Sequence, residues 1–127
     1  QIFSALRSLS SLLEVHLKNL GRTGSGLYRA AQTLFGQHSW WNNWDAAKQR
    51  VGETLNSTTP IDDRLRDALA LTPTDDDSRF WKSLLVAYIV RNYTVHQMEI
   101  QCALVQAHAY QVLGHILHVM VAARDHM

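Results

Sequence analysis

The chain has 127 residues, of which 46% are apolar and 18% are charged, and its formal net charge is +1. This composition excludes a disordered chain, and residues 1–127 are expected to form one domain with one core. No apolar run approaches the roughly 20 residues of a membrane-spanning helix, so we expect a soluble chain without a membrane partner. The single cysteine, Cys102, excludes a disulfide framework and favours a reducing, cytoplasmic location.

Apolar residues recur every three or four positions along the chain, which predicts an all-α helical bundle. The first apolar stripe starts at Phe3, continues to Leu20 and ends at Gly21, before a flexible connector over residues 21–26. A second, short helix is expected over residues 27–35.

Capping residues mark the next three helices. Ser39 is expected to cap a helix that runs to about Leu55. Pro60 lies at the first turn of a short helix. Thr74 is expected to cap the helix that follows, with the acidic residues 75–77 in its first turn. This position explains the acidic run, and a metal site there is the less favoured alternative.

From Phe80 to Val90 nearly every residue is apolar or aromatic, which indicates a helix buried on all sides. The last helix is expected to run from about Val95 to Arg124. Residues that recur every three or four positions lie on the same face of a helix, and this spacing distinguishes two faces here. Its inward stripe comprises Val105, Ala109, Val112, Ile116, Val119 and Ala123, and its polar face comprises Gln97, Gln101, His108, Gln111, His115 and His118.

Between these two helices lie Arg91 and His96, five residues apart. In an unbroken helix they would point about 140° apart. Two arrangements can bring them together: a helix break between them, or a partner group from a second subunit. Thr94 and Gln97 match a capping box, and the run before them has reduced helix propensity, so a helix break at this motif is expected.

Arg91 and His96 would then have the chemistry needed to cleave RNA without a metal ion. A histidine in the first turn of a helix is held neutral by the helix dipole and can remove the proton of a 2′-hydroxyl. An arginine offers a permanent charge and a planar fork of donors to the phosphate oxygens. Spacing alone favours a structural alternative, in which Arg91 extends from a helix end and His96 caps locally.

The run RNYTVH over residues 91–96 resembles the motif of the HEPN superfamily, in which an arginine and a polar residue precede a histidine after a short spacer. The resemblance implies a metal-independent endoribonuclease of the kind found in CRISPR-associated effectors, toxins and antiviral defence systems. It implies that Arg91 and His96 are catalytic, that Asn92 supports them, and that a homodimer lines one cleft with both motifs. It also implies frequent fusion to a regulatory domain, so a domain excised from a longer protein is expected. No cofactor and no metal are expected.

Other residues have functional and structural interpretations. His115 and His118 are spaced to share a metal ion, although a solvated or dimer-facing stripe is favoured. The adjacent Trp40 and Trp41 are not expected to face one core, so one of them is expected to be exposed or in an interface, and base stacking is the less favoured role. Cys102 is expected to be a buried small apolar residue.

A dimer is expected because the late helices are too apolar for one small bundle to cover. The candidates for the extra buried surface are Val86, Ile89, Val90 and the segment 119–123. The alternative function is a non-catalytic helical dimerisation module or an antitoxin-like binding module.

Overall fold

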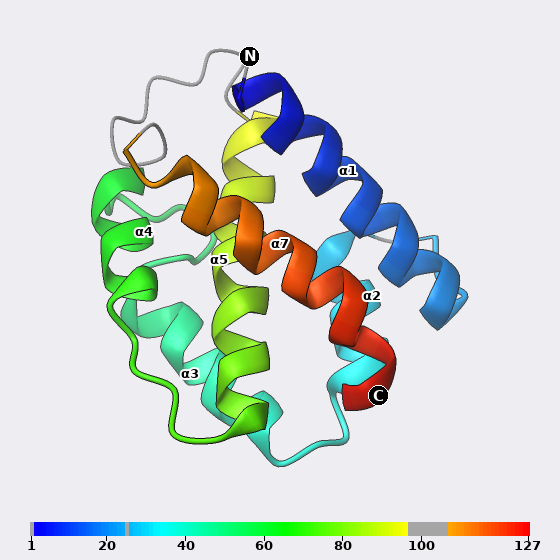
Figure 1. The fold of residues 1–127 in the computed structure, drawn as a ribbon. Coiled ribbons are helices and arrows are strands. Elements are labelled where there is room, and N and C mark those ends of the chain that lie inside the picture. The colour runs from blue at the N-terminus through cyan, green and yellow to red at the C-terminus, as the bar shows by residue number, and fades with distance from the viewer. Residues whose placement is uncertain (1, 25, 97–106) are drawn as a thin grey trace.

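The computed structural model describes residues 2–24, 26–96 and 107–127, and this part of the chain contains helices and no strand. The expected all-α, bundle-like architecture is confirmed (Figure 1). None of the helices in the described ranges is long and apolar enough to cross a membrane. In chain order the elements are α1 (Ile2–Gly21), α2 (Leu27–Phe35), α3 (Trp40–Arg50), α4 (Ile61–Leu69), α5 (Asp76–His96), α7 (Ala109–Ala122) and the 3-10 helix η1 (Ala123–His126).

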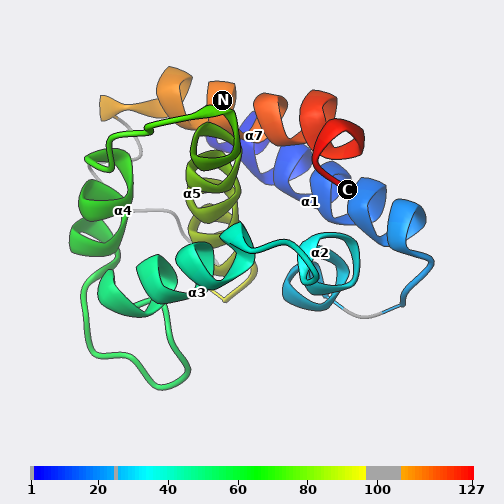
Figure 2. The same ribbon diagram turned by 90° about the horizontal axis from the view of Figure 1, so that it is seen from below.

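Helix α5 is the centre of the molecule. It contacts α7, α4, α3 and α1, and Figure 2 shows it with α1 and α7 on one side and α3 on the other. A helix surrounded in this way must be apolar on nearly all sides, as predicted for residues 80–90. Six of its side chains have no exposed surface at all: Phe80, Leu84, Leu85, Val86, Ala87 and Ile89.

An aromatic cluster fills the space between α5, α3 and α2. Trp40 packs on Phe35 and Phe80, whereas Trp41 stacks on Trp44 at a ring distance of 4.7 Å. Both Trp40 and Trp41 are buried, so the expectation that one of them is exposed or in an interface is wrong. The pair can share one core because aromatic side chains from three helices meet around α3, and each indole packs against a different set of rings.

The loop after α3 turns sharply and directs Glu53 inward. Helix α3 ends at Arg50 and not near Leu55, and Ser39 makes no side-chain capping bond. Gly52 has a φ of +87°, and a Cβ atom there would lie 2.5 Å from Thr59 Oγ1. Only glycine therefore fits this turn.

Asp75, and not Thr74, caps α5. The backbone N–H of Ser78 donates to Asp75 Oδ1 at 2.7 Å, and the N–H of Asp75 donates back to Ser78 Oγ at 2.9 Å. These reciprocal bonds form a capping box. Asp76 and Asp77 occupy the first turn, as expected for the acidic run.

The predicted helix break at the RNYTVH motif is wrong, since α5 continues through residues 91–96. Thr94 therefore does not start a new helix, and the expected place of His96 in the first turn of a helix is wrong, because His96 is the last residue of α5. The propensity cost of a few β-branched and aromatic residues is small, at most about 0.7 kcal/mol each. Side-chain bonds from Arg91 and Asn92 to other elements hold the end of α5 and offset that cost.

The last helix is shorter than expected. His108 has a φ of −118° and a ψ of 27°, so α7 begins only at Ala109, and the chain turns into η1 after Ala122. The inward stripe is confirmed where it is described, because Ala109, Val112, Ile116, Val119 and Ala123 are buried. Val105 and the other predicted positions over 97–106 lie outside the described residues.

Candidate functional site

The end of α5 places Arg91 against α1. The Nε and Nη2 atoms of Arg91 lie 3.3 and 3.4 Å from the two carboxylate oxygens of Glu14, and Nη1 donates to Ser11 Oγ at 3.0 Å. The Arg91 side chain is 18% exposed. Pairing through two donors fixes the plane of the guanidinium group, which a single point charge could not do.

Asn92 contacts a different carboxylate, that of Glu53 in the loop after α3. Asn92 Nδ2 donates to Glu53 Oε2 at 2.8 Å, and Arg64 Nη1 donates to Glu53 Oε1 at 3.0 Å. Arg64 also donates from Nε to the Thr59 carbonyl oxygen at 2.7 Å. Glu53 is only 6% exposed, so its charge depends on both partners. The network joins α5, α4 and the 51–60 loop.

Two hollows meet at Tyr88 and Asn92, which line both of them. The larger, about 700 Å³, lies between the 51–60 loop, α4 and α5, and contains Glu53 and Arg64. The smaller, about 300 Å³, lies between α1, α2 and α5, and contains Glu14 and Arg91. Burial raises the pKa of Tyr88. The hydrogen bond with Asn92 lowers this pKa in part, and the charge of Glu53 raises it. Tyr88 is therefore a neutral phenol near neutral pH.

His96 is helical, but its side chain lies outside the described part of the chain. Five helical positions separate His96 from Arg91, which corresponds to about 140° of rotation and about 7.5 Å along the axis. The structure therefore brings Arg91 and Asn92 to neighbouring hollows and does not place Arg91 and His96 on one face of α5.

A third hollow, about 380 Å³, lies between α4, α5 and α7, and we call it the basic hollow. Ser83 Oγ lies 2.8 Å from His115 Nδ1, and Lys82 Nζ donates to the Leu69 carbonyl oxygen at 2.9 Å. Its lining residues are Leu69, Arg79, Lys82, Ser83, Gln111, Gly114, His115 and His118. The predicted polar face of the last helix is thus not a fully solvated stripe, because His115 and His118 are half-buried against α5.

Burial, together with the smaller effects of the neighbouring Lys82 and His118, lowers the pKa of His115 to about 4. Burial also lowers the pKa of His118. Both imidazoles are neutral near neutral pH and each then has one N–H donor and one acceptor nitrogen.

In the described ranges no group of three or more His, Cys, Asp or Glu side chains could hold a metal ion. The acidic run at the start of α5 has a structural use. Asp75 caps the helix, and His126 Nδ1 lies 3.1 Å from Asp77 Oδ1 while its ring stacks on Phe80 at 4.3 Å. Cys102 lies outside the described residues.

Sequence reasoning missed Glu14, Glu53 and Ser83, the residues that hold Arg91, Asn92 and His115. Glu14 lies 77 positions before Arg91, and Glu53 lies 39 positions before Asn92. A lone glutamate on a polar helix face gives no local sign of such a partner. For Glu53 the neighbouring Gly52 was a weak signal, because glycine there indicates a tight turn.

Comparisons with protein-family models, with curated proteins and with solved structures find no match for this chain. What the chain does must therefore follow from its own residues.

Proposed function

We propose that the chain is an RNA-cleaving domain of the HEPN type that acts as a homodimer and needs no metal ion. One observation carries the proposal: the run RNYTVH occupies the end of the central helix of an all-α domain. A second supports it, because the guanidinium of Arg91 is fixed by Glu14 and Ser11 at the wall of an open hollow. A prepositioned guanidinium suits a transition state whose charge develops on phosphoryl oxygens.

In the proposed reaction His96 removes the proton from a ribose 2′-hydroxyl. The 2′-oxygen attacks the adjacent phosphorus, and the bond from phosphorus to the 5′-oxygen breaks. The protonated His96 then returns its proton to the leaving 5′-oxygen. Arg91 stabilises the charge on the phosphoryl oxygens. Asn92 acts through its bond to Glu53, which fixes the end of α5. The products are a 2′,3′-cyclic phosphate and a 5′-hydroxyl.

The unbroken helix gives the second protomer a definite role in this proposal. Arg91 and His96 of one chain diverge by about 140°, so one chain cannot easily present both to a single phosphate. We therefore assign Arg91 of one protomer and His96 of its partner to each composite site. A two-fold axis would generate two such sites in each dimer.

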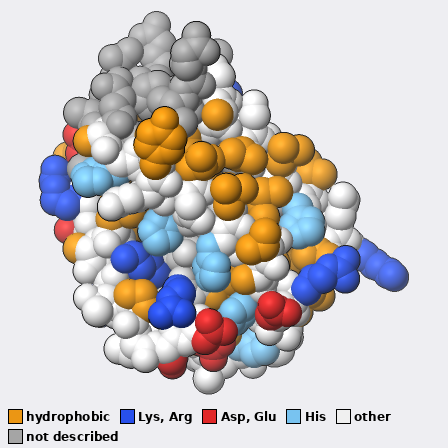
Figure 3. Space-filling view, in the orientation of Figure 1, with side chains coloured by type: hydrophobic (Ala, Val, Ile, Leu, Met, Phe, Trp, Pro, Cys, Tyr) orange, Lys and Arg blue, Asp and Glu red, His pale blue; other side chains and the backbone are white. Residues whose placement is uncertain are grey.

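An exposed apolar surface supports the dimer. The candidates predicted on α5 are buried within one chain, since Val86, Ile89 and Val90 are at most 2% exposed. Exposed apolar side chains instead follow the outer faces of α7 and α1, where Figure 3 shows them as a continuous band. We call this surface the α1–α7 face, and its exposed members are Leu12, Val15, Tyr110, Leu117 and Val121. Contiguous apolar patches of this kind typically mark interfaces.

The test is cleavage of a labelled single-stranded RNA in the presence of EDTA. The parent chain is expected to cut the RNA and leave 2′,3′-cyclic phosphate ends. His96→Ala should reduce the rate by about 10²–10⁴-fold, whereas the matched control His38→Ala, between α2 and α3, should not. Cleavage that disappears in EDTA and returns with a divalent ion would contradict the proposal, as would a fully active His96→Ala variant.

The second candidate function is a non-catalytic dimerisation or antitoxin-like binding module. It is favoured by the contacts of Arg91 and Asn92, which both bind carboxylates of their own chain. Such contacts are what purely structural residues would make. In this case the parent chain would bind a protein partner through the α1–α7 face and would not cleave RNA under any of the conditions above.

A further inference from the structure

The basic hollow differs in charge from the other two hollows. Its lining includes Arg79 and Lys82 and contains no Asp or Glu. By contrast, Glu53 lines the hollow of about 700 Å³ beside Lys48 and Arg64, and Glu14 lines the hollow of about 300 Å³ beside Arg91. Of these three hollows, the basic hollow is the one whose positive charge is not balanced by a carboxylate among its lining residues.

The contacts of the two cations confirm this imbalance. Lys82 Nζ donates to the Leu69 carbonyl oxygen at 2.9 Å, and in the described ranges no carboxylate lies within ion-pair distance of it. Arg79 lies 3.9 Å from Asp76, but both side chains are largely exposed, at 65% and 80%. An ion pair that is long and exposed contributes little. Both cations can therefore bind an additional anion.

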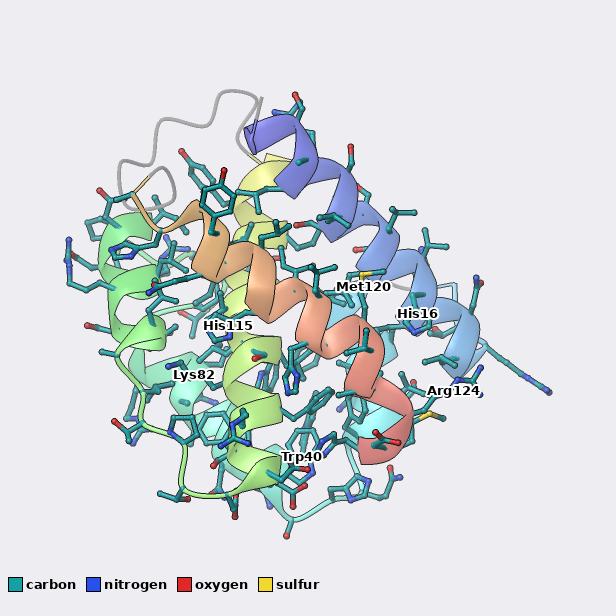
Figure 4. The ribbon with its side chains drawn as sticks, in the orientation of Figure 1. His16, Trp40, Lys82, His115, Met120 and Arg124 are labelled. Atoms are coloured by element: carbon teal, nitrogen blue, oxygen red, sulfur yellow. The ribbon has the colours of Figure 1, made fainter. Side chains whose placement is uncertain are left out.

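The His115 imidazole adds a neutral hydrogen-bond donor beside these two cations. Figure 4 shows His115 and Lys82 close together beside α5. The bond between His115 Nδ1 and Ser83 fixes the ring, which leaves Nε2 on the opposite edge for a ligand. His118 Nε2 is buried and has no hydrogen-bond partner in the described part of the chain. Because a ligand in the open hollow cannot reach an atom without exposed surface, His115 Nε2 is the imidazole donor assigned to the ligand.

We propose that the basic hollow binds the phosphate group of a small phosphorylated molecule, about the size of a nucleoside monophosphate. Two cations and several N–H donors match a dianion with three terminal oxygens better than a carboxylate with two. The volume of about 380 Å³ exceeds that of a bare phosphate and falls in the usual range for small-molecule sites, roughly 300–1,000 Å³. Leu69 and the open space above Gly114 leave room for the rest of the molecule.

This site is independent of the proposed nuclease. It shares no lining residue with the hollows of Arg91 and Asn92. RNA cleavage can fail while phosphate binding is found, and the reverse is equally possible, so the two proposals can be tested separately.

The test follows the histidine side-chain NMR signals of the full chain, assigned with single His→Gln variants, during titration with inorganic phosphate, adenosine 5′-monophosphate and acetate. Phosphate and the nucleotide should shift the His115 and His118 signals at millimolar concentration or below, and the His16 signal should stay in place. The nucleotide should bind at least about fivefold more tightly than phosphate, since its remainder adds contacts. Acetate should bind more weakly than both.

Two arginine variants provide the matched comparison. Arg79→Met removes an exposed arginine that lines the hollow, and Arg50→Met removes an exposed arginine that does not. Arg79→Met should weaken nucleotide binding about tenfold, as loss of one charged hydrogen bond does, and Lys82→Met should weaken it at least as much. Arg50→Met should leave it within twofold. Because Arg79 is exposed, its variant tests the proposal even if Lys82→Met does not fold.

Three outcomes would overturn the assignment. One is the absence of any shift of His115 and His118 with either phosphate ligand at about 10 mM. Another is an equal loss of affinity in Arg79→Met and Arg50→Met, which would mean that only net charge matters. The third is nucleotide binding no tighter than that of inorganic phosphate, or acetate binding as tight as both.

Discussion

At the scale of single residues, the charged groups of this chain differ in how much they contribute to folding. Glu53 is buried and held by Arg64 and Asn92, whereas Asp63 pairs with Arg66 at 2.7 Å on an open surface. Breaking a buried pair leaves a charge without compensation, but breaking an exposed pair leaves a charge that water solvates.

Glu53→Ala should therefore lower the free energy of unfolding by about 3–5 kcal/mol. The matched control Asp63→Ala should lower it by less than about 1 kcal/mol. Chemical denaturation of the two variants beside the parent measures both values. Similar losses in the two variants would show that the Glu53 network does not hold the 51–60 loop.

The His115 imidazole makes stability depend on pH. Its pKa in the folded chain is about 4, below the ordinary value of about 6.5. The unfolded chain therefore takes up a proton on His115 before the folded chain does. The stabilisation is complete above the ordinary pKa and is lost as pH falls from about 6.5 towards 4.

His115→Gln removes this titration and keeps a side chain that can bind Ser83. The melting temperature of the parent should fall more between about pH 7 and pH 4.5 than that of the variant, because only the parent has this histidine to protonate. Paired thermal melts at the two pH values measure the difference. An equal fall in both proteins would mean that His115 does not contribute to the acid sensitivity.

At the scale of elements, local chemistry sets where the helices begin. Asp75 and Ser78 form the reciprocal bonds that cap α5, and Thr74 contributes only its backbone N–H to Ser78 Oγ at 2.8 Å.

Asp75→Ala should lower the free energy of unfolding by about 1 kcal/mol because the first turn of α5 loses its cap. Thr74→Ala should change the melting temperature very little. If Thr74→Ala is the more destabilising of the two, the assignment of the cap is wrong.

At the scale of the whole molecule, the α1–α7 face should control assembly. Val121→Glu places a charge in that face. The parent is expected to sediment as a dimer at tens of micromolar. The variant is expected to sediment as a monomer and to lose RNA cleavage. Leu55→Glu is the matched control, because Leu55 is an exposed apolar residue in the loop after α3. A parent chain that is strictly monomeric at that concentration would contradict the proposed dimer.

The sequence predicted those parts of the fold that depend on neighbours along one helix. The apolar spacing of α1 and the inward stripe of α7 are examples, because helical periodicity repeats within a few residues. It could not predict where distant elements meet. The contact of Arg91 with Glu14 and the burial of both Trp40 and Trp41 arise only when three or more helices pack together. The expected break at Thr94 was wrong for the same reason, since tertiary contacts at the end of α5 outweigh weak local propensity.

The composite site is tested most directly by mixing two inactive proteins. Arg91→Ala and His96→Ala are each expected to have lost RNA cleavage. After the two are unfolded together and refolded, about half of the dimers should contain one chain of each kind, and one of the two sites in such a dimer has both an intact Arg91 and an intact His96. The account predicts that cleavage in EDTA returns to about a quarter of the parent rate. A mixture as inactive as its components, with mixed dimers shown to be present, would contradict it.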